Sequence, residues 1–170
     1  MNRTEEVILV NEQDSQIGLM EKLEAHQKGL LHRAFSVFIF NSKGDLLLQQ
    51  RALSKYHSPG LWTNTCCSHP RAGEENAAAA HRRLKEEMGF DCDLEYQGFL
   101  IYKVQFENGL FEHELDHVFT GVFNGIPQLN SDEVAAFRWT SLQNLQQEID
   151  ADANRFTHWL QLILKQKKWF

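Results

Sequence analysis

The chain has 170 residues, of which 42% are hydrophobic, so we expect one domain with a buried core over residues 1–170. Its net charge of -6 and its lack of a broad basic tract argue against nucleic acid as a partner. The apolar runs are well below the roughly 20 residues of a membrane helix, which predicts a soluble protein without membrane attachment. Three cysteines, of which two are adjacent, predict the reduced cytoplasm.

Short strands and one short helix are expected before residue 52. Residues 5–11 read as a strand and residues 19–26 as a helix. The β-rich runs 34–40 and 45–51 flank the segment 41–44, which ends in glycine. Two such runs around a glycine turn predict a β-hairpin.

A longer helix is predicted over residues 74–90, and Gly89 supplies its C-terminal stop. Apolar residues recur along it at helical spacing: Ala77, Ala80, Leu84 and Met88. Two acid–base pairs stand four residues apart on one turn: Arg82 with Glu86, and Arg83 with Glu87. Such pairs support a helix.

The rest of the chain again alternates strands and a helix. Residues 96–106 and 110–123 flank Asn108-Gly109, a strong hairpin turn signal, and residues 134–140 read as a further strand. A last helix over about 153–165 has one apolar face: Phe156, Trp159, Leu160 and Ile163. Strands on either side of a central helix predict an α/β (α+β) domain, a mixed sheet flanked by helices.

Acids and imidazoles could form a metal site. On the strand 110–123, the side-chain period of two puts three acids on one face: Glu112, Glu114 and Asp116. That face is either solvated or turned toward a cation. Three histidines, His26, His32 and His69, are too irregularly spaced for one element, and each alone is more often an ordinary core or surface residue. If the fold gathers them with the acids, they suit a borderline divalent metal such as zinc or manganese.

A thiol, two cations and an indole are further candidates. Cys67 lies in the stretch 62–70, WTNTCCSHP. A cysteine can be an inert small hydrophobe, but a nearby metal or cation would lower its pKa from about 8.5 toward neutrality, where it can accept and return protons. Arg51 and Lys55 could present cations to a phosphate or be solvated. Trp159 is a core aromatic unless a cation lies beside it.

The stretch 68–90 resembles a degenerate Nudix box. Ser68 stands where the family has its first glycine, and Glu74 follows six residues later. The tail over 82–90 resembles the family pattern Arg-Glu-apolar-x-Glu-Glu-x-Gly-apolar, except that Arg83 replaces a glutamate with which the Nudix hydrolases bind metal. This departure counts against pyrophosphate hydrolysis.

Together with RALSK (51–55), PGLWTNTCCSHP (59–70) and EHE (112–114), the chain resembles type 1 isopentenyl-diphosphate delta-isomerases from about Lys22 to Trp159. The resemblance implies a Nudix-like single domain. It also implies interconversion of isopentenyl and dimethylallyl diphosphate through a carbocation-like intermediate, in isoprenoid biosynthesis. The alternatives are a Nudix pyrophosphohydrolase acting on a nucleoside or prenyl diphosphate, and a non-catalytic, metal-stabilised binding domain.

The same resemblance implies roles for single residues. The ligands of one divalent ion, Zn²⁺ or Mn²⁺, would be His26, His32, His69, Glu112 and Glu114. The catalytic thiol, carboxylate and assisting tyrosine would be Cys67, Glu114 and Tyr102. Glu87 would bind a Mg²⁺ that arrives with the diphosphate. The residues around the substrate would be Lys22, Arg51, Lys55 and Arg83, with Trp159 beside the carbon chain. The small-molecule substrate would be bound by a monomer or weak dimer.

Overall fold

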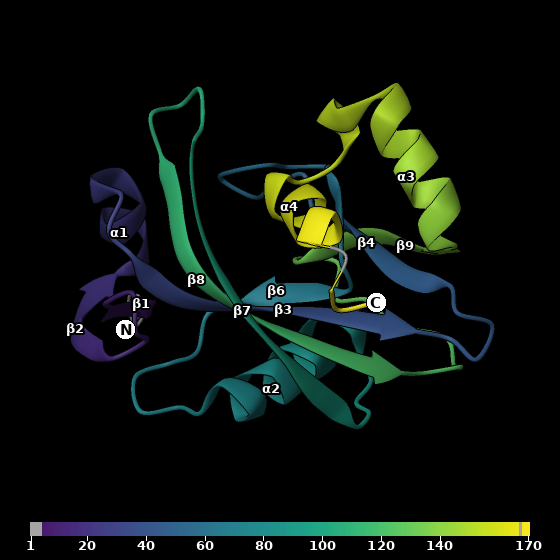
Figure 1. The fold of residues 1–170 in the computed structure, drawn as a ribbon, viewed down its shortest axis with the longest axis horizontal. Coiled ribbons are helices and arrows are strands. Elements are labelled where there is room, and N and C mark those ends of the chain that lie inside the picture. Colours follow the sequence, from purple (N-terminus) through teal and green to yellow (C-terminus); the bar gives the residue numbers. More distant parts are fainter. Residues whose placement is uncertain (1–4, 167) are drawn as a thin grey trace.

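A computed structural model describes residues 5–166 and 168–170 of the chain. In that part of the chain, one mixed sheet carries helices on both faces (Figure 1). The first elements are β1 (Glu6–Val10), β2 (Gln16–Glu21), α1 (Lys22–Lys28), β3 (His32–Phe40), β4 (Leu46–Arg51), β5 (Trp62–Thr63) and β6 (Cys66–Ser68). They are followed by α2 (Asn76–Met88), β7 (Leu94–Gln105), β8 (Phe111–Val122), β9 (Val134–Thr140), α3 (Leu142–Ala151), a 3-10 turn (Ala153–Arg155) and α4 (His158–Gln166).

Strand β3 lies at the centre of the sheet because both of its edges are paired. It runs parallel to β8 along its whole length, with His32 opposite Glu114. On its other edge it runs antiparallel to β6, with Ser36 opposite Cys67. The continuous apolar run that the sequence shows here is typical of a strand buried on both faces.

Two apolar layers enclose β3. Phe35 and Val37 pack on the face covered by α2, together with the fully buried Leu84 of that helix. Phe38 points the other way, toward Leu160 of α4. Figure 1 shows α2 on one side of the sheet and α3 and α4 on the other, so alternate side chains of one strand supply both cores.

The predicted α/β (α+β) class is confirmed, and so are most predicted elements. These are the strands near 5–11, 34–40, 45–51, 96–106, 110–123 and 134–140, and the helix near 74–90. The turn at 41–44 also forms, with Gly44 N–H donating to the Asn41 carbonyl at 3.0 Å. The two strands beside it pair only at Phe40 and Leu46, because β3 is paired with β6 and β8, whereas β4 is paired with β5 and β9.

Two predicted helix starts are wrong. Residues 19–21 belong to β2, which pairs with β1, and the first helix begins only at Lys22. Glu21 fixes that boundary because its Oε2 accepts the N–H of Glu24 at 2.8 Å. The last helix begins at His158 rather than 153, since residues 153–155 form a 3-10 turn.

Three further features depart from the expected pattern. Ala77 is exposed in the first turn of α2, so the buried stripe of that helix begins with Ala79 and Ala80. Helix α3 was not anticipated; Ser141 Oγ caps it by accepting the N–H of Asn144 at 3.1 Å. Strand β2 also has no clear sequence signal, because none of its side chains is fully buried. Among the described residues, no helix is long and apolar enough to cross a membrane.

Gly89 generates a prediction about stability. Its φ is +71°, and a Cβ there would stand 2.4 Å from the carbonyl oxygen of Gln128, whereas a Cβ on Gly44, with φ +84°, would meet nothing within 4 Å. We expect Gly44→Ala to lower the free energy of unfolding by about 1 to 2 kcal/mol for the left-handed backbone. Gly89→Ala should lower it by about 1 to 3 kcal/mol more, because the backbone must also shift. Urea denaturation of both variants measures this, and equal losses would contradict the clash.

Candidate active site

The acidic face of β8 is buried rather than solvated. Glu112, Glu114 and Asp116 are 3%, 6% and 1% exposed. Because His32 lies opposite Glu114 in the parallel pair of β3 and β8, the register of the sheet places an imidazole beside the middle carboxylate. The sequence left open whether this face is solvated or turned toward a cation, and its burial excludes a solvated face.

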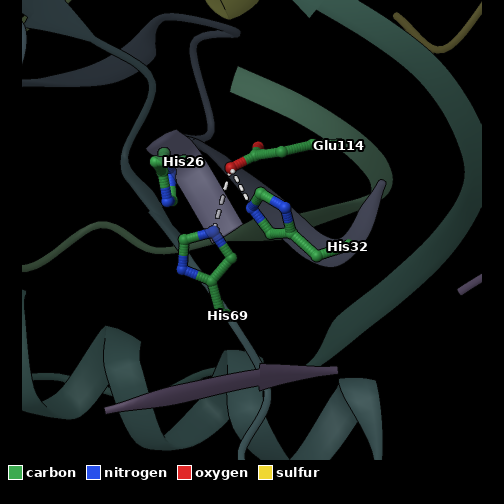
Figure 2. Close-up of side chains that lie close together, drawn as sticks. All are labelled: His26, His32, His69 and Glu114. Carbon is green, nitrogen blue, oxygen red and sulfur yellow. Dashed lines mark hydrogen bonds and ion pairs between the residues drawn. The ribbon is translucent and has the colours of Figure 1, made fainter. Parts of the chain in front are cut away.

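Three imidazoles, those of His26, His32 and His69, gather around Glu114, as Figure 2 shows. Their ligand atoms all lie within 4.8 Å of one another. Glu114 Oε1 lies 2.9 Å from His69 Nε2 and 3.4 Å from His32 Nε2. Two ligands about 2.1 Å from one ion stand roughly 3.0 to 3.4 Å apart at right or tetrahedral angles. The four residues come from α1, β3, the segment after β6, and β8, so only the fold brings them together.

Backbone carbonyls orient two of the imidazoles. His26 Nδ1 lies 2.6 Å from the Lys22 carbonyl oxygen, and His32 Nδ1 lies 2.8 Å from that of Leu30. The Nε2 atoms of both rings are buried without a hydrogen-bond partner in the described chain. An imidazole held by a carbonyl through one nitrogen, with the other nitrogen unoccupied, is typical of a metal ligand. Burial lowers the pKa of His26 and lowers that of His69 to about 4, so both rings are neutral, as coordination requires. The four residues fit a divalent metal ion.

Glu112, which the resemblance places in the same ligand set, lies in an adjoining group. Its carboxylate is gathered with His26 and with His57 from the loop between β4 and β5. Glu112 Oε1 is 3.3 Å from His57 Nε2. His26 is therefore shared by two sets of possible metal ligands. His57 was not predicted from the sequence, because a loop has no periodicity to mark which side chain turns inward.

Tyr102 links the two carboxylates. Its hydroxyl oxygen lies 2.9 Å from Glu112 Oε2 and 2.7 Å from Glu114 Oε2. A hydroxyl has one hydrogen to donate, so one of the two contacts requires a proton on the carboxyl group. Burial and the Glu114 charge raise the pKa of Glu112, whereas the contacts of Glu114 with His32 and His69 outweigh burial and hold the pKa of Glu114 well below its usual value. These opposite shifts favour a proton on Glu112, with Tyr102 donating to Glu114, and an ion coordinated by Glu112 would displace that proton.

The candidate residues meet at one cavity of about 60 Å³. Those that line it are Lys22, Arg51, Lys55, Cys67, His69, Arg83, Glu87, Glu112, Glu114 and Trp159. The remaining candidates, His26, His32 and Tyr102, are buried and reach the cavity through their contacts with Glu112 or Glu114. Cys67 and Glu114 belong to β6 and β8, on opposite sides of β3, and both face this space.

The thiol of Cys67 is not activated in the way expected from a nearby cation. Its side chain is partly exposed where it opens onto the cavity, yet the protein atoms around it exclude most water. This burial raises the pKa of Cys67, with only partial opposition from the Arg51 charge. Cys67 is therefore a protonated thiol at neutral pH, and it can deliver a proton without first gaining one.

Every candidate cation already has a partner. Lys22 Nζ lies 3.1 Å from Glu5 Oε2, and Arg83 Nη2 lies 2.6 Å from Glu87 Oε1. Lys55 pairs with Glu133, which also lies 3.4 Å from Arg83. Arg51 stacks over the Trp159 ring at 5.4 Å, so the indole does hold a cation beside it. Glu133 was not singled out in the sequence because it lies in a loop before β9 with no motif around it.

The loop that joins β4 to β5 forms one wall of the cavity through Tyr56 and His57. The cavity volume equals about two water molecules at roughly 30 Å³ each, below the roughly 300 Å³ of a small ligand pocket. Tyr56 and His57 separate it from an outer hollow of about 680 Å³, which lies between the tip of the β7–β8 hairpin and the start of α4. The loop must move for a ligand to enter.

Comparisons with known proteins identify the family of the chain. The sequence matches the NUDIX domain family over residues 30–160. It is 55% identical to an isopentenyl-diphosphate Delta-isomerase of Pectobacterium atrosepticum, over 92% of this chain and 88% of that one. It is 51% identical to the isopentenyl-diphosphate Delta-isomerase of Serratia proteamaculans, over 95% of this chain and 90% of that one.

Solved structures show the same fold. The crystal structure of a Deinococcus radiodurans protein superimposes with a TM-score of 0.78 at 19% identity, covering 95% of this chain and 98% of that one. A MutT protein of Methanosarcina mazei gives a TM-score of 0.66 at 17% identity, covering 80% and 91%. The fold, the matched domain and the identity to these relatives lead to one conclusion: the chain belongs to the Nudix superfamily and, within it, to the isopentenyl-diphosphate Delta-isomerase family.

Proposed function

We propose that this chain interconverts isopentenyl diphosphate and dimethylallyl diphosphate, the activity that the names of its Pectobacterium and Serratia relatives describe for those proteins. One observation carries the proposal. Cys67 and Glu114, from strands on opposite sides of β3, line a single cavity together with cationic side chains. A hydrolase has no need of a thiol and a carboxyl group facing each other, whereas an isomerase that moves protons does.

Moving a double bond by one carbon adds a proton at one carbon and removes another nearby, through a tertiary carbocation-like state. Glu114 and Cys67 are the two proton carriers in this proposal. Tyr102 orients the Glu114 carboxyl through its 2.7 Å hydrogen bond, and the Cys67 thiol is protonated before the reaction because burial raises its pKa. Each positioned proton transfer contributes about 10² to 10⁴ in rate.

A divalent ion, Zn²⁺ or Mn²⁺, is proposed at His26, His32, His69 and Glu114, with Glu112 able to join. An ion bound there would stabilise the Glu114 carboxylate, which takes up a proton from the substrate while the protonated Cys67 thiol gives one to the alkene. The chain's own contribution is to hold that carboxyl in place. His32 and His69 contact Oε1, and Tyr102 contacts Oε2, so neither oxygen can rotate away.

The diphosphate would bind beside four cations, three of which are now paired with acids. Lys22, Arg51, Lys55 and Arg83 line the cavity, and together they supply binding energy remote from the reacting carbons. Glu87 is 4% exposed and faces the same space, which fits a Mg²⁺ arriving with the substrate. In a chain of net charge -6, such a local cluster is what an anionic ligand needs.

Trp159 would stabilise the cationic carbon. It is 3% exposed, and Arg51 lies over its ring, so this ring has a cation neighbour already. A desolvated cation–π contact contributes about 2 kcal/mol, roughly thirtyfold in rate. A cavity of about 60 Å³ also leaves little room for water, which would destroy the carbocation.

We also propose that the chain works in the reduced cytoplasm. Cys66, Cys67 and Cys92 are free thiols in the described chain, as expected for the reduced cytoplasm. A monomer or weak dimer stays a prediction.

Deuterium incorporation tests the activity directly. The protein, supplied with Mn²⁺ or Zn²⁺ and with Mg²⁺, is incubated with isopentenyl diphosphate in D₂O and followed by proton NMR. We expect dimethylallyl diphosphate that carries deuterium, because the proton carriers exchange with solvent. Inorganic phosphate without any isomer would instead establish the pyrophosphohydrolase.

Replacement of Cys67 should separate chemistry from binding. In Cys67→Ala we expect isomerisation to fall by about 10² to 10⁴ while diphosphate binding is kept, since the cations are untouched. Turnover and calorimetric binding of dimethylallyl diphosphate measure the two effects. The matched control is Cys92→Ala, at a thiol that lines a hollow elsewhere on the sheet. Full activity of Cys67→Ala would refute the proton role of the thiol and favour the binding-domain alternative.

Glu114→Gln should abolish turnover, because an amide cannot take up and return the proton, and should weaken metal binding as well. Activity is measured at saturating Mn²⁺, and metal affinity by competition with a chelating dye. Glu95→Gln, an exposed residue of β7, is the control. If saturating metal restores more than about a tenth of the wild-type rate, which is more than the loss of a proton carrier allows, Glu114 is a metal ligand only.

A further inference from the structure

His57 has no part in the ligand set expected from the sequence, yet it is 8% exposed and its Nε2 lies 3.3 Å from Glu112 Oε1. We propose that His57 is a metal ligand of this chain: with His26 and Glu112 it forms a second position for the divalent ion, beside the position formed by His26, His32, His69 and Glu114. The proposal rests on the proposed metal centre, and it does not depend on which reaction the centre serves.

The donor chemistry of this second group is that of a metal site. Its three ligand atoms lie within 4.8 Å of one another, and all three residues are buried. Two imidazoles and one carboxylate are a set that binds zinc in enzymes and leaves a position open for another ligand. The 3.3 Å between the His57 nitrogen and the Glu112 oxygen is close to the roughly 3.4 Å expected of two ligands on one tetrahedral ion.

The His57 ring is held in place by its neighbours. It stacks on Phe106, with ring centres 5.5 Å apart and planes 14° apart, and it meets the Trp159 ring edge-on at 6.0 Å. A second stack, with centres 5.8 Å apart, sets it beside His26. Its Nδ1 is buried and unpartnered within residues 5–166 and 168–170.

The two positions share one ion. His26 Nδ1 already contacts the Lys22 carbonyl oxygen at 2.6 Å, so only Nε2, with a single lone pair, can coordinate. We therefore expect one ion per chain.

An ion in the second position would tie the loop between β4 and β5 to strand β8. His57 stands in that loop, and Glu112 stands in β8. The same loop separates the small cavity from the outer hollow through Tyr56 and His57. The ion would thus hold the cavity closed in the second position and release the loop in the first.

The test removes the first position and asks whether the second still binds. His69→Ala takes a ligand from the first group only, and Mn²⁺ and Zn²⁺ are titrated into the metal-depleted protein by calorimetry. We expect His69→Ala to bind one ion with reduced affinity. Addition of His57→Ala should then weaken binding by at least about tenfold, whereas His57→Ala alone should change it only a few-fold, because the first group remains. The matched control is His69→Ala with His158→Ala, an exposed histidine that lines the same hollow.

Two further measurements guard against a folding defect. His57→Gln keeps a polar side chain of similar size, and it should weaken binding in the His69→Ala background as His57→Ala does. The ligand-field absorption of Co²⁺ bound to His69→Ala should also change when His57 is replaced, which a purely structural role would not produce. Backbone amides of residues 54–58 should exchange more slowly with solvent when His69→Ala is loaded with metal, and this protection should vanish without His57.

The proposal is overturned if His69→Ala takes up no ion, if it takes up two, or if replacing His57 in that background leaves the affinity within twofold. These outcomes are independent of turnover. A wild-type protein that binds metal through His57 but forms no dimethylallyl diphosphate would contradict the proposed isomerase and leave the ligand assignment standing.

Discussion

The pairing of β3 with β6 on one edge and β8 on the other is the constraint on which the site depends. It sets Ser36 opposite Cys67 and His32 opposite Glu114, so the thiol and the carboxylate reach the same cavity from opposite sides. A slip of one residue in either pair would turn the polar side chains toward α2. The apolar contacts of Phe35 and Phe38 with the two helical layers fix that register. Packing far from the chemistry therefore decides whether the chemistry is possible.

The three buried acids of β8 can be tolerated because only one of them is charged. Glu114 is stabilised as a carboxylate by His32 and His69. Glu112 carries the proton that its contact with Tyr102 requires. Asp116 accepts a 2.8 Å hydrogen bond from Ser36 Oγ, and burial together with the Glu114 charge raises its pKa, so it too is neutral. An isolated buried charge is costly, and the neighbours on either side of Glu114 avoid adding to it.

The sequence predicted most of what has a local cause and less of what depends on tertiary contacts. Periodicity and turn residues located β8, α2 and the hairpin at Asn108-Gly109, because these signals act within a few residues. The alternation along β8 put its acids on one face. The pairing of β3 with β8 is not local, so only the motif resemblance indicated that His32 and Glu114 meet. His57 escaped both kinds of reasoning, since it lies in a loop and matches no motif. Helix starts were misplaced for a related reason: β2 takes residues 19–21 through its pairing with β1.

Glu133 influences which anions can bind in the cavity. Its carboxylate contacts both Lys55 and Arg83, so it competes with an incoming anion for these two cations. A visiting monocarboxylate offers these cations nothing that Glu133 does not already provide at a far higher effective concentration. A diphosphate, with several negative oxygens that can engage four cations at once, is the better competitor. Glu133 therefore selects against common monocarboxylate metabolites, because they cannot displace it from Lys55 and Arg83.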